Sequence, residues 1–148
     1  MKYIDFVHEQ SKKGCSMCRG DDYIIQHNDY AYVTPALAPY TPWHLLVILK
    51  SHKEKLSDLS VQELQAMSDL WTAWIQILEA EYGEVVGFVR QWEVFGTTGK
   101  SQAHLHRHIV PHFSNLYGGS QESSDARKIL TREEIVALGE VSQGLLAW

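Results

Sequence analysis

The sequence predicts an α+β domain in which one antiparallel sheet of about five strands packs against a long helix, with shorter helices near the termini. Three observations predict this class. Short apolar segments are joined mainly by tight turns, one long amphipathic helix lies mid-chain, and strands do not alternate with helices as in a doubly wound sheet. With 148 residues and no internal repeats, we expect a single domain over 1–148.

Five segments rich in β-branched, aromatic and aliphatic residues are predicted as strands. They lie at 23–26, 30–34, 43–49, 85–94 and 103–110. The first two flank the turn-like sequence His27-Asn28-Asp29, which is typical of a hairpin. Three prolines between 35 and 42 indicate an irregular crossing before the third strand.

The long helix begins at a capping box, Ser60-Val61-Gln62-Glu63, and ends at Gly83. Its apolar residues recur at helical spacing: Leu64, Met67, Leu70, Trp71, Trp74, Ile75 and Leu78. A second capping box, Thr131-Arg132-Glu133-Glu134, opens a short C-terminal helix. Residues 2–12 are compatible with a short N-terminal helix, and 114–126 with a loop.

Composition excludes some classes of function. A net charge of -5 argues against a protein that binds duplex nucleic acid, which usually carries a basic stripe. No apolar run of about 18 residues predicts a membrane span, and the N-terminal residues lack the apolar stretch of a signal peptide. We therefore expect a cytoplasmic protein.

Four of the eight histidines lie between 104 and 112, and His104, His106 and His108 alternate strictly. In a strand, these three side chains would share one face. Imidazoles in a row on a sheet face need metal, phosphate, water or backbone partners. Two functional interpretations are metal chelation and catalysis at phosphorus, in which one imidazole attacks and a protonated neighbour stabilises the charged oxygens.

The two cysteines, Cys15 and Cys18, are separated by two residues. In a reducing compartment a structural disulfide is disfavoured. A thioredoxin-like redox pair would need a βαβ unit, which this sequence does not predict. A zinc site is favoured over both, and it would require two further ligands.

Two motifs together resemble the histidine-triad (HIT) nucleotide-binding family. Residues 42–52 read PWHLLVILKSH, similar to that family's P-x-H-hydrophobic-x-V-x-x-K-x-H strand, and residues 104–110 read HLHRHIV, similar to its His-x-His-x-His signature. Arg107 is a departure at a position that is usually apolar. The resemblance covers about residues 15–113, and the tail at 114–148 carries no motif of the family.

The resemblance implies a nucleotide hydrolase or nucleotidyl transferase that acts at the α-phosphate through a covalent nucleotidyl-histidine intermediate. His106 would be the nucleophile, His108 would contact the phosphate, and His44 would complete the triad near the leaving group. The implied substrate contacts are Gly99, Lys100, Ser101 and Glu93. Phosphoramidase, dinucleoside polyphosphate hydrolase and phosphorylase activities are not distinguished.

Related branches that carry two such cysteines, including the galactose phosphate uridylyltransferases, complete a zinc site with two histidines. The resemblance therefore implies a structural zinc held by Cys15, Cys18, His52 and His104, with no cofactor needed for the chemical step. It also implies a homodimer, with the long helix and the strand at 85–94 as candidate contacts. Many members bind ribose through a carboxylate, and residues 34–40 contain none.

Two other functions stay open at this point. The histidines would hold a catalytic ion in a metal-dependent hydrolase, although the histidine strand offers no carboxylate to assist. The second open function is that of a non-catalytic module, which binds nucleotides or is stabilised by zinc for interaction with a partner.

Overall fold

The computed structural model describes residues 5, 15–19, 23–89, 104–112 and 128–146. Four predicted elements fall wholly or partly outside these residues: the helix at 2–12 apart from Asp5, the loop at 114–126, the end of the strand at 85–94, and the first residue of the strand at 103–110.

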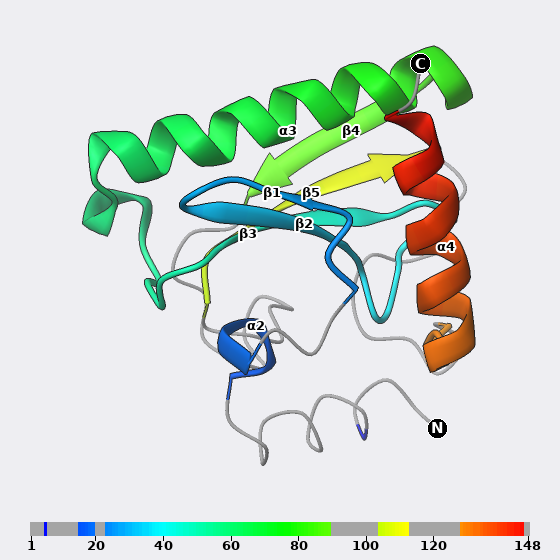
Figure 1. Cartoon of the computed structure of the whole chain (residues 1–148), viewed down its shortest axis with the longest axis horizontal. Coiled ribbons are helices and arrows are strands. Elements are labelled where there is room, and N and C mark those ends of the chain that lie inside the picture. Colours follow the sequence, from blue (N-terminus) through cyan, green and yellow to red (C-terminus); the bar gives the residue numbers. More distant parts are fainter. Residues whose placement is uncertain (1–4, 6–14, 20–22, 90–103, 113–127, 147–148) are drawn as a thin grey trace.

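The described strands form one antiparallel sheet in the order β1-β2-β3-β5-β4 (Figure 1), which confirms the predicted class. The strands are β1 (Gln26–His27), β2 (Ala31–Pro35), β3 (Leu45–Leu49), β4 (Val85–Val89) and β5 (His106–Pro111). β1 and β2 form the predicted hairpin, but β1 comprises only Gln26 and His27 instead of 23–26, so His27 belongs to the strand and not to the turn. Asn28 closes the turn, because its side-chain oxygen accepts the backbone N–H groups of Tyr30 and Ala31.

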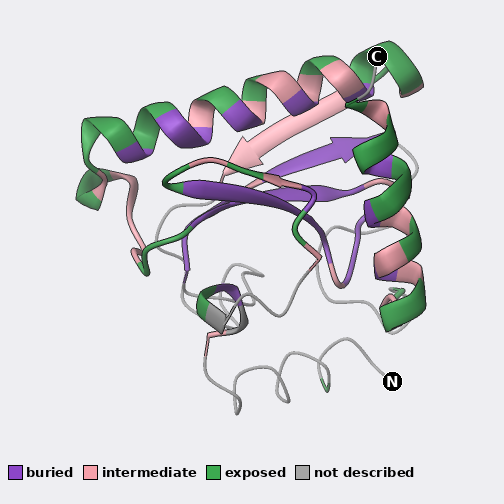
Figure 2. Cartoon of the chain, viewed as in Figure 1, coloured by how far each residue is buried: buried purple, intermediate pink, exposed green. Residues whose placement is uncertain are grey.

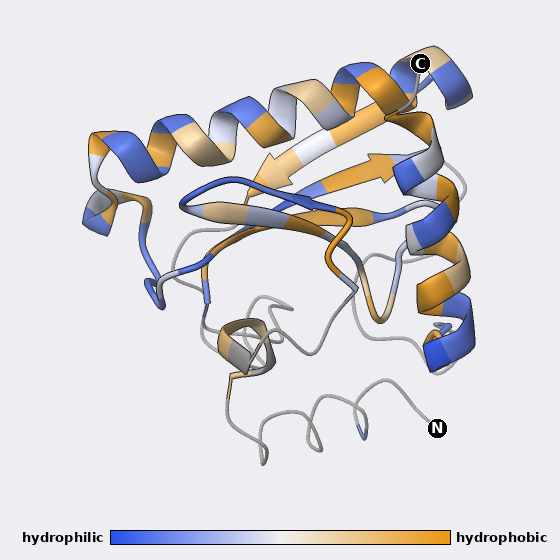
Figure 3. Ribbon diagram, in the orientation of Figure 1, coloured by the Kyte–Doolittle hydropathy of each residue, from blue (hydrophilic) through white to orange (hydrophobic). Residues whose placement is uncertain are grey.

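The long helix, α3 (Val61–Tyr82), covers one face of the sheet (Figure 1). Its capping box forms as predicted, and Gly83 ends it with a φ of 86°, a conformation that glycine adopts without a steric penalty. The buried side of α3 packs against β2, β3 and β5, whereas its outer side faces solvent (Figures 2 and 3). Leu64, one of the residues whose spacing predicted the helix, is 42% exposed.

The C-terminal helix, α4 (Arg132–Leu145), also begins at its predicted capping box. It lies against the first strands, where the Tyr23 hydroxyl donates to Gln143 at 2.7 Å. The Gln143 amide donates in turn to the Ile25 carbonyl at 3.2 Å. Contact is close at Gly139, where an added Cβ would lie 2.2 Å from the Tyr23 ring. The helix therefore packs against the segment 23–25 that leads into β1, and against β2.

A four-residue helix, α2 (Ser16–Arg19), lies on the other side of the sheet from α3 (Figure 1). Met17 packs there with a small buried cluster: Tyr32, Ala36, Leu46 and Ile48. The Tyr32 hydroxyl donates to the Met17 carbonyl at 2.7 Å, which ties α2 to the sheet. Within the described residues, no helix combines the length and apolar character that crossing a bilayer requires.

Candidate functional site

The histidines of β5 lie on the face of the sheet opposite α3. His106 pairs with Ile48, and His108 pairs with Leu46, in register with β3. Those β3 residues belong to the cluster beside α2. Residues that alternate with the histidines face α3 instead, as the period of a strand predicts: Leu105 and Ile109 are in the main core, and the Arg107 guanidinium lies over Trp71 at 4.9 Å. The cation therefore has an aromatic partner at a position that is usually apolar.

His44 and His108 form a buried hydrogen-bonded pair. The Tyr40 backbone N–H donates to His44 Nδ1 at 3.0 Å, so the proton of neutral His44 is on Nε2. That Nε2 lies 2.9 Å from His108 Nδ1, to which it donates. His108 Nδ1 is thus an acceptor, and neutral His108 carries its proton on Nε2.

His106 has the opposite tautomer. Its Nδ1 lies 2.8 Å from the His104 carbonyl, an acceptor, so Nδ1 carries the proton and Nε2 carries the lone pair. The His106 and His108 ring centroids are 4.9 Å apart. The two residues are 7% and 8% exposed, and their neighbouring rings carry a basic nitrogen and an N–H donor. This combination suits attack on, and stabilisation of, one electrophilic centre.

Aromatic rings fix the His108 ring in place. Phe88 stacks on it with a centroid distance of 4.5 Å, and Tyr40 lies nearly parallel to it at 5.6 Å. From α3, on the opposite face of the sheet, the Trp71 indole N–H donates to the His108 backbone carbonyl at 3.2 Å. Sequence analysis missed Phe88 and Tyr40, and no motif marks them. Phe88 becomes recognisable only once the register places it opposite His108.

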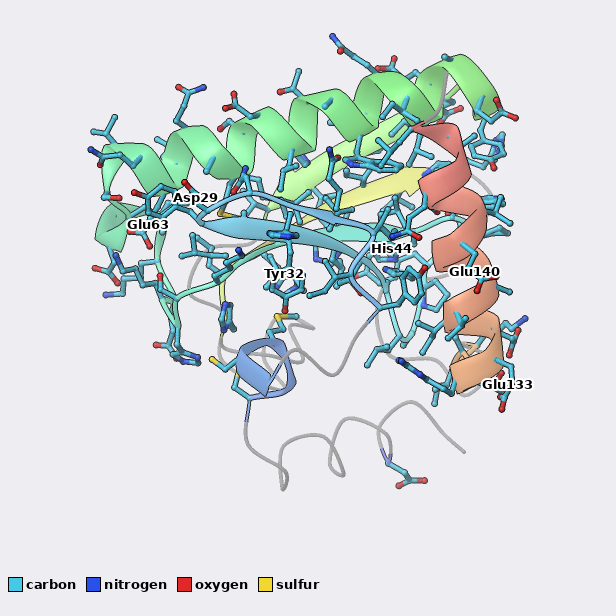
Figure 4. All side chains as sticks on the ribbon, viewed as in Figure 1. Asp29, Tyr32, His44, Glu63, Glu133 and Glu140 are labelled. Atoms are coloured by element: carbon cyan, nitrogen blue, oxygen red, sulfur yellow. The ribbon has the colours of Figure 1, made fainter. Side chains whose placement is uncertain are left out.

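The backbone immediately before His44 adopts an unusual conformation. Trp43 has a φ of 68°, in the left-handed region that bulky residues rarely adopt. Its ring stacks on Tyr82, near the end of α3, at a centroid distance of 5.0 Å. Such conformations persist only where the surroundings enforce them, and they concentrate at functional sites. Here the Trp43 ring contacts α3, and the next residue, His44 (labelled in Figure 4), belongs to the histidine pair.

The four predicted metal ligands come together. Cys15, Cys18, His52 and His104 each offer one ligand atom, and these atoms lie within 4.8 Å of one another. His104 Nδ1 is 3.3 Å from each sulfur, and His52 Nδ1 is 3.2 Å from Cys18 Sγ. A tetrahedral zinc ion with ordinary bond lengths separates its sulfur and nitrogen ligands by roughly 3.5 Å.

The chemistry of these groups also fits a cation. His104 Nε2–H donates to the Leu49 carbonyl, which leaves the Nδ1 lone pair directed at the thiols. Burial, followed by the hydrogen bond and charge of Cys15, raises the pKa of the Cys18 thiol. A divalent cation offsets this effect, because metal binding deprotonates thiols. The described residues contain no other cluster of at least three such ligands.

A buried carboxylate lies beside the segment that carries His52. Glu63, at the start of α3 (Figure 4), accepts hydrogen bonds from Lys53, Ser51 and the Ser60 backbone. The Lys53 ammonium, then Ser51 and Ser60, lower the pKa of this carboxyl to about 2. Glu63 is therefore ionised at neutral pH.

The remaining predicted substrate contacts lie outside the described residues. They are Glu93, Gly99, Lys100 and Ser101. Their roles stay predictions, as do the catalytic roles assigned to the three triad histidines.

Comparisons with known proteins agree on one family. A family model described as "HIT domain" matches residues 19–115. The comparison with curated proteins finds no significant match.

Solved structures share the fold at low sequence identity. A hypothetical histidine triad nucleotide-binding protein from Sulfolobus tokodaii has a TM-score of 0.68 and 19% identity, over 90% of this chain and 92% of that one. A Zn-bound histidine triad family protein from Mycobacterium smegmatis has a TM-score of 0.64 and 20% identity, over 91% of this chain and 96% of that one. The Plasmodium falciparum diadenosine triphosphate hydrolase has a TM-score of 0.60 and 17% identity, over 84% of this chain and 74% of that one.

Proposed function

The chain belongs to the HIT domain family, and on that basis we propose that it hydrolyses or transfers nucleotidyl groups at the α-phosphate of a nucleotide or nucleotide conjugate. The observation that carries the proposal is the pair of complementary tautomers on β5. A basic Nε2 on His106 and an N–H donor on His108 lie on adjacent rings of one sheet face.

In the first step, His106 Nε2 attacks the α-phosphorus and forms a P–N bond. The bond from phosphorus to the leaving group breaks, and the leaving group departs with its electron pair. The His104 carbonyl accepts the Nδ1–H of His106 and stabilises the positive charge that develops on the ring. His108 Nε2–H donates to the charged phosphoryl oxygens.

In the second step, an acceptor attacks the same phosphorus. The P–N bond breaks, its electron pair returns to His106 Nε2, and the acceptor's proton passes to a base or to solvent. Water as acceptor gives a hydrolase, whereas phosphate or a sugar phosphate gives a phosphorylase or transferase. His44 acts in both steps by keeping the proton of His108 on Nε2.

We also propose that Cys15, Cys18, His52 and His104 hold a structural zinc ion. The ion supplies charge neutralisation for the thiolates and joins α2 to the segments that carry the histidines. His104 then serves two purposes, because its ring faces the metal site while its carbonyl orients His106.

The proposed assembly is a homodimer with contacts through α3 and β4. β4 forms one edge of the described sheet, and all five of its residues are half-buried. Analytical ultracentrifugation tests this assembly, and a purely monomeric species at micromolar concentration would contradict it.

The test of the catalytic proposal compares native protein with His106→Ala. The substrates are a panel of nucleoside phosphoramidates, dinucleoside polyphosphates and sugar nucleotides. We expect native turnover of at least one class and a loss of roughly 10³-fold or more in His106→Ala. His27→Ala is the control, since His27 is exposed and lies in the β1–β2 hairpin.

Two outcomes would replace the proposal with another function. Tight nucleotide binding without turnover of any panel member would indicate a binding module. Turnover that survives in His106→Ala, and that a chelator abolishes while the protein stays folded, would indicate a metal-dependent hydrolase.

A further inference from the structure

We propose that Glu63 is a positioning residue for the metal site, and that it holds the segment 51–53 so that the His52 imidazole points at the cysteines. This inference rests on the zinc site proposed above. It concerns a side chain that lies outside the catalytic triad and that contacts none of the four ligand atoms directly.

The Glu63 carboxylate joins the start of α3 to the segment before it. Oε2 accepts the Ser51 hydroxyl at 2.6 Å, and Oε1 accepts both the Lys53 ammonium and the Ser60 backbone N–H, the latter at 2.9 Å. The side chain is only 8% exposed. Hydrogen bonds to a buried, ionised carboxylate are stronger than neutral ones, so this connection is firm.

Two of the residues that Glu63 binds, Ser51 and Lys53, flank His52 on both sides. His52 itself is 45% exposed, so packing contributes little to its orientation. Its side chain contacts Cys18, His104 and the Glu54 carboxylate, which lies 4.0 Å from Nε2. The ring therefore depends on its fixed neighbours in the chain for its direction.

The same segment is connected to the second histidine ligand. The Leu105 backbone N–H, next to His104, donates to the Lys53 carbonyl at 2.7 Å. A shift of residues 51–53 would therefore disturb the spacing between His52 and His104. Their ring centroids lie 5.0 Å apart in an edge-to-face arrangement. Zinc requires near-tetrahedral spacing, so such a shift weakens binding.

The chain offers a matched control in α4. Glu134 forms the same capping box with Thr131 and an ion pair with Lys128 at 2.7 Å. Its partners Thr131 and Lys128 do not belong to the segment that carries His52. Glu134→Gln thus removes the ion pair and the charge of an equivalent N3 glutamate without touching the metal site, and both substitutions keep the cap because Gln also serves at N3 of a capping box.

The experiment measures zinc affinity by competition with a chromophoric chelator. We expect Glu63→Gln to bind zinc about 10-fold to 100-fold more weakly than native protein, the usual effect of losing a residue that orients a ligand. Ser51→Ala, which keeps the cap and the ion pair, is expected to lose about fivefold. Glu134→Gln is expected to stay within about twofold of native. Visible absorption of Co²⁺-loaded protein gives a second readout, and it should change only in the first two variants.

The outcomes separate this inference from the proposals on which it depends. Glu63→Gln affinity equal to that of Glu134→Gln overturns the positioning role alone. If native protein binds no zinc, both the proposed metal site and this inference are wrong. The proposal for His106 is tested separately, by turnover. If Glu63→Gln does not fold, Ser51→Ala decides: native-like zinc affinity and an unchanged Co²⁺ spectrum overturn the inference.

Discussion

His44 is predicted to act through His108 and not on the reacting atoms. It is 1% exposed, and its Nε2–H donates to His108 Nδ1 at 2.9 Å. His44→Ala removes this donor, so the proton of His108 can occupy either nitrogen. Only the fraction with the proton on Nε2 then presents a donor to the phosphate.

The expected loss follows from the strength of one hydrogen bond. A neutral hydrogen bond contributes about 0.5–1.5 kcal/mol, which corresponds to roughly 2-fold to 13-fold in rate. Removing the donor itself, in His108→Ala, is expected to cost about 10²-fold to 10³-fold. The predicted order of severity is therefore His106→Ala, then His108→Ala, then His44→Ala.

Two amide substitutions distinguish the hydrogen bond from packing. The Gln amide nitrogen in His44→Gln takes the place of Nε2 and can donate to His108. The shorter Asn amide in His44→Asn takes the place of Nδ1 and cannot reach. With kcat/KM measured on the substrate that the panel identifies, we expect His44→Gln within about threefold of native and His44→Asn close to His44→Ala.

A loss in His44→Ala as large as that in His106→Ala, with no recovery in His44→Gln, would refute this reasoning. It would mean that His44 itself contacts the leaving group. Circular dichroism of each variant is the control for folding, since His44 is buried.

Three further predictions concern stability. The pKa of Glu63 is about 2 in the folded protein against 4.5 as its ordinary value. Its stabilising effect is therefore complete above pH 4.5 and is lost as the pH falls towards 2. In urea unfolding, native protein should be more stable than Glu63→Gln by on the order of 1–3 kcal/mol at neutral pH. This difference in the free energy of unfolding should become smaller between pH 4.5 and pH 2. A difference that does not change with pH contradicts the prediction. A Cβ added at Gly139 would lie 2.2 Å from the Tyr23 ring, whereas one added at Gly144 would have no atom outside its own helix backbone within 4 Å. Gly139→Ala should thus lose about 1–3 kcal/mol and Gly144→Ala should gain up to about 1 kcal/mol, so equal effects would disprove the docking of α4. Chelation should lower the melting temperature while turnover per folded molecule is kept, and prompt loss of turnover in folded protein would argue for a catalytic ion.

Local signals in the sequence predicted α3, the start of α4 and the face that His106 and His108 share. Ser60, Glu63 and Gly83 define the ends of α3 because caps act within a few residues of the helix terminus. The alternation of His106 and His108 predicted their shared face because a strand has a period of two, whereas the predicted strand at 103–110 begins only at His106, so His104 precedes it. These features depend on neighbours in the chain, which the sequence displays directly.

Features that depend on distant residues were not predictable in the same way. His104 differs from His106 because Leu49 accepts its Nε2–H and because Cys15, 89 residues away, lies beside Nδ1. The resemblance to a family suggested that ligand set, but neither spacing nor composition did. The tautomer of His108 likewise depends on a contact with His44, which is 64 residues away.

The position of α4 was also beyond the reach of the sequence. Its capping box predicted where the helix begins, but nothing marked the segment 23–25 as the surface it would contact. The contact depends on Gly139 lying against Tyr23, a pairing that only the tertiary structure brings together. Trp43 is a similar case, since its positive φ contradicts the local preference of a bulky residue.

The central claim is that one imidazole forms a covalent bond to phosphorus. The most direct measurement is mass spectrometry of protein quenched in acid-free conditions during turnover of a panel substrate. The account predicts a mass increase of one nucleotidyl group, assigned by peptide fragmentation to His106 and absent in His106→Ala. Full turnover with no adduct on native protein, or an adduct on a different residue that persists in His106→Ala, would contradict it.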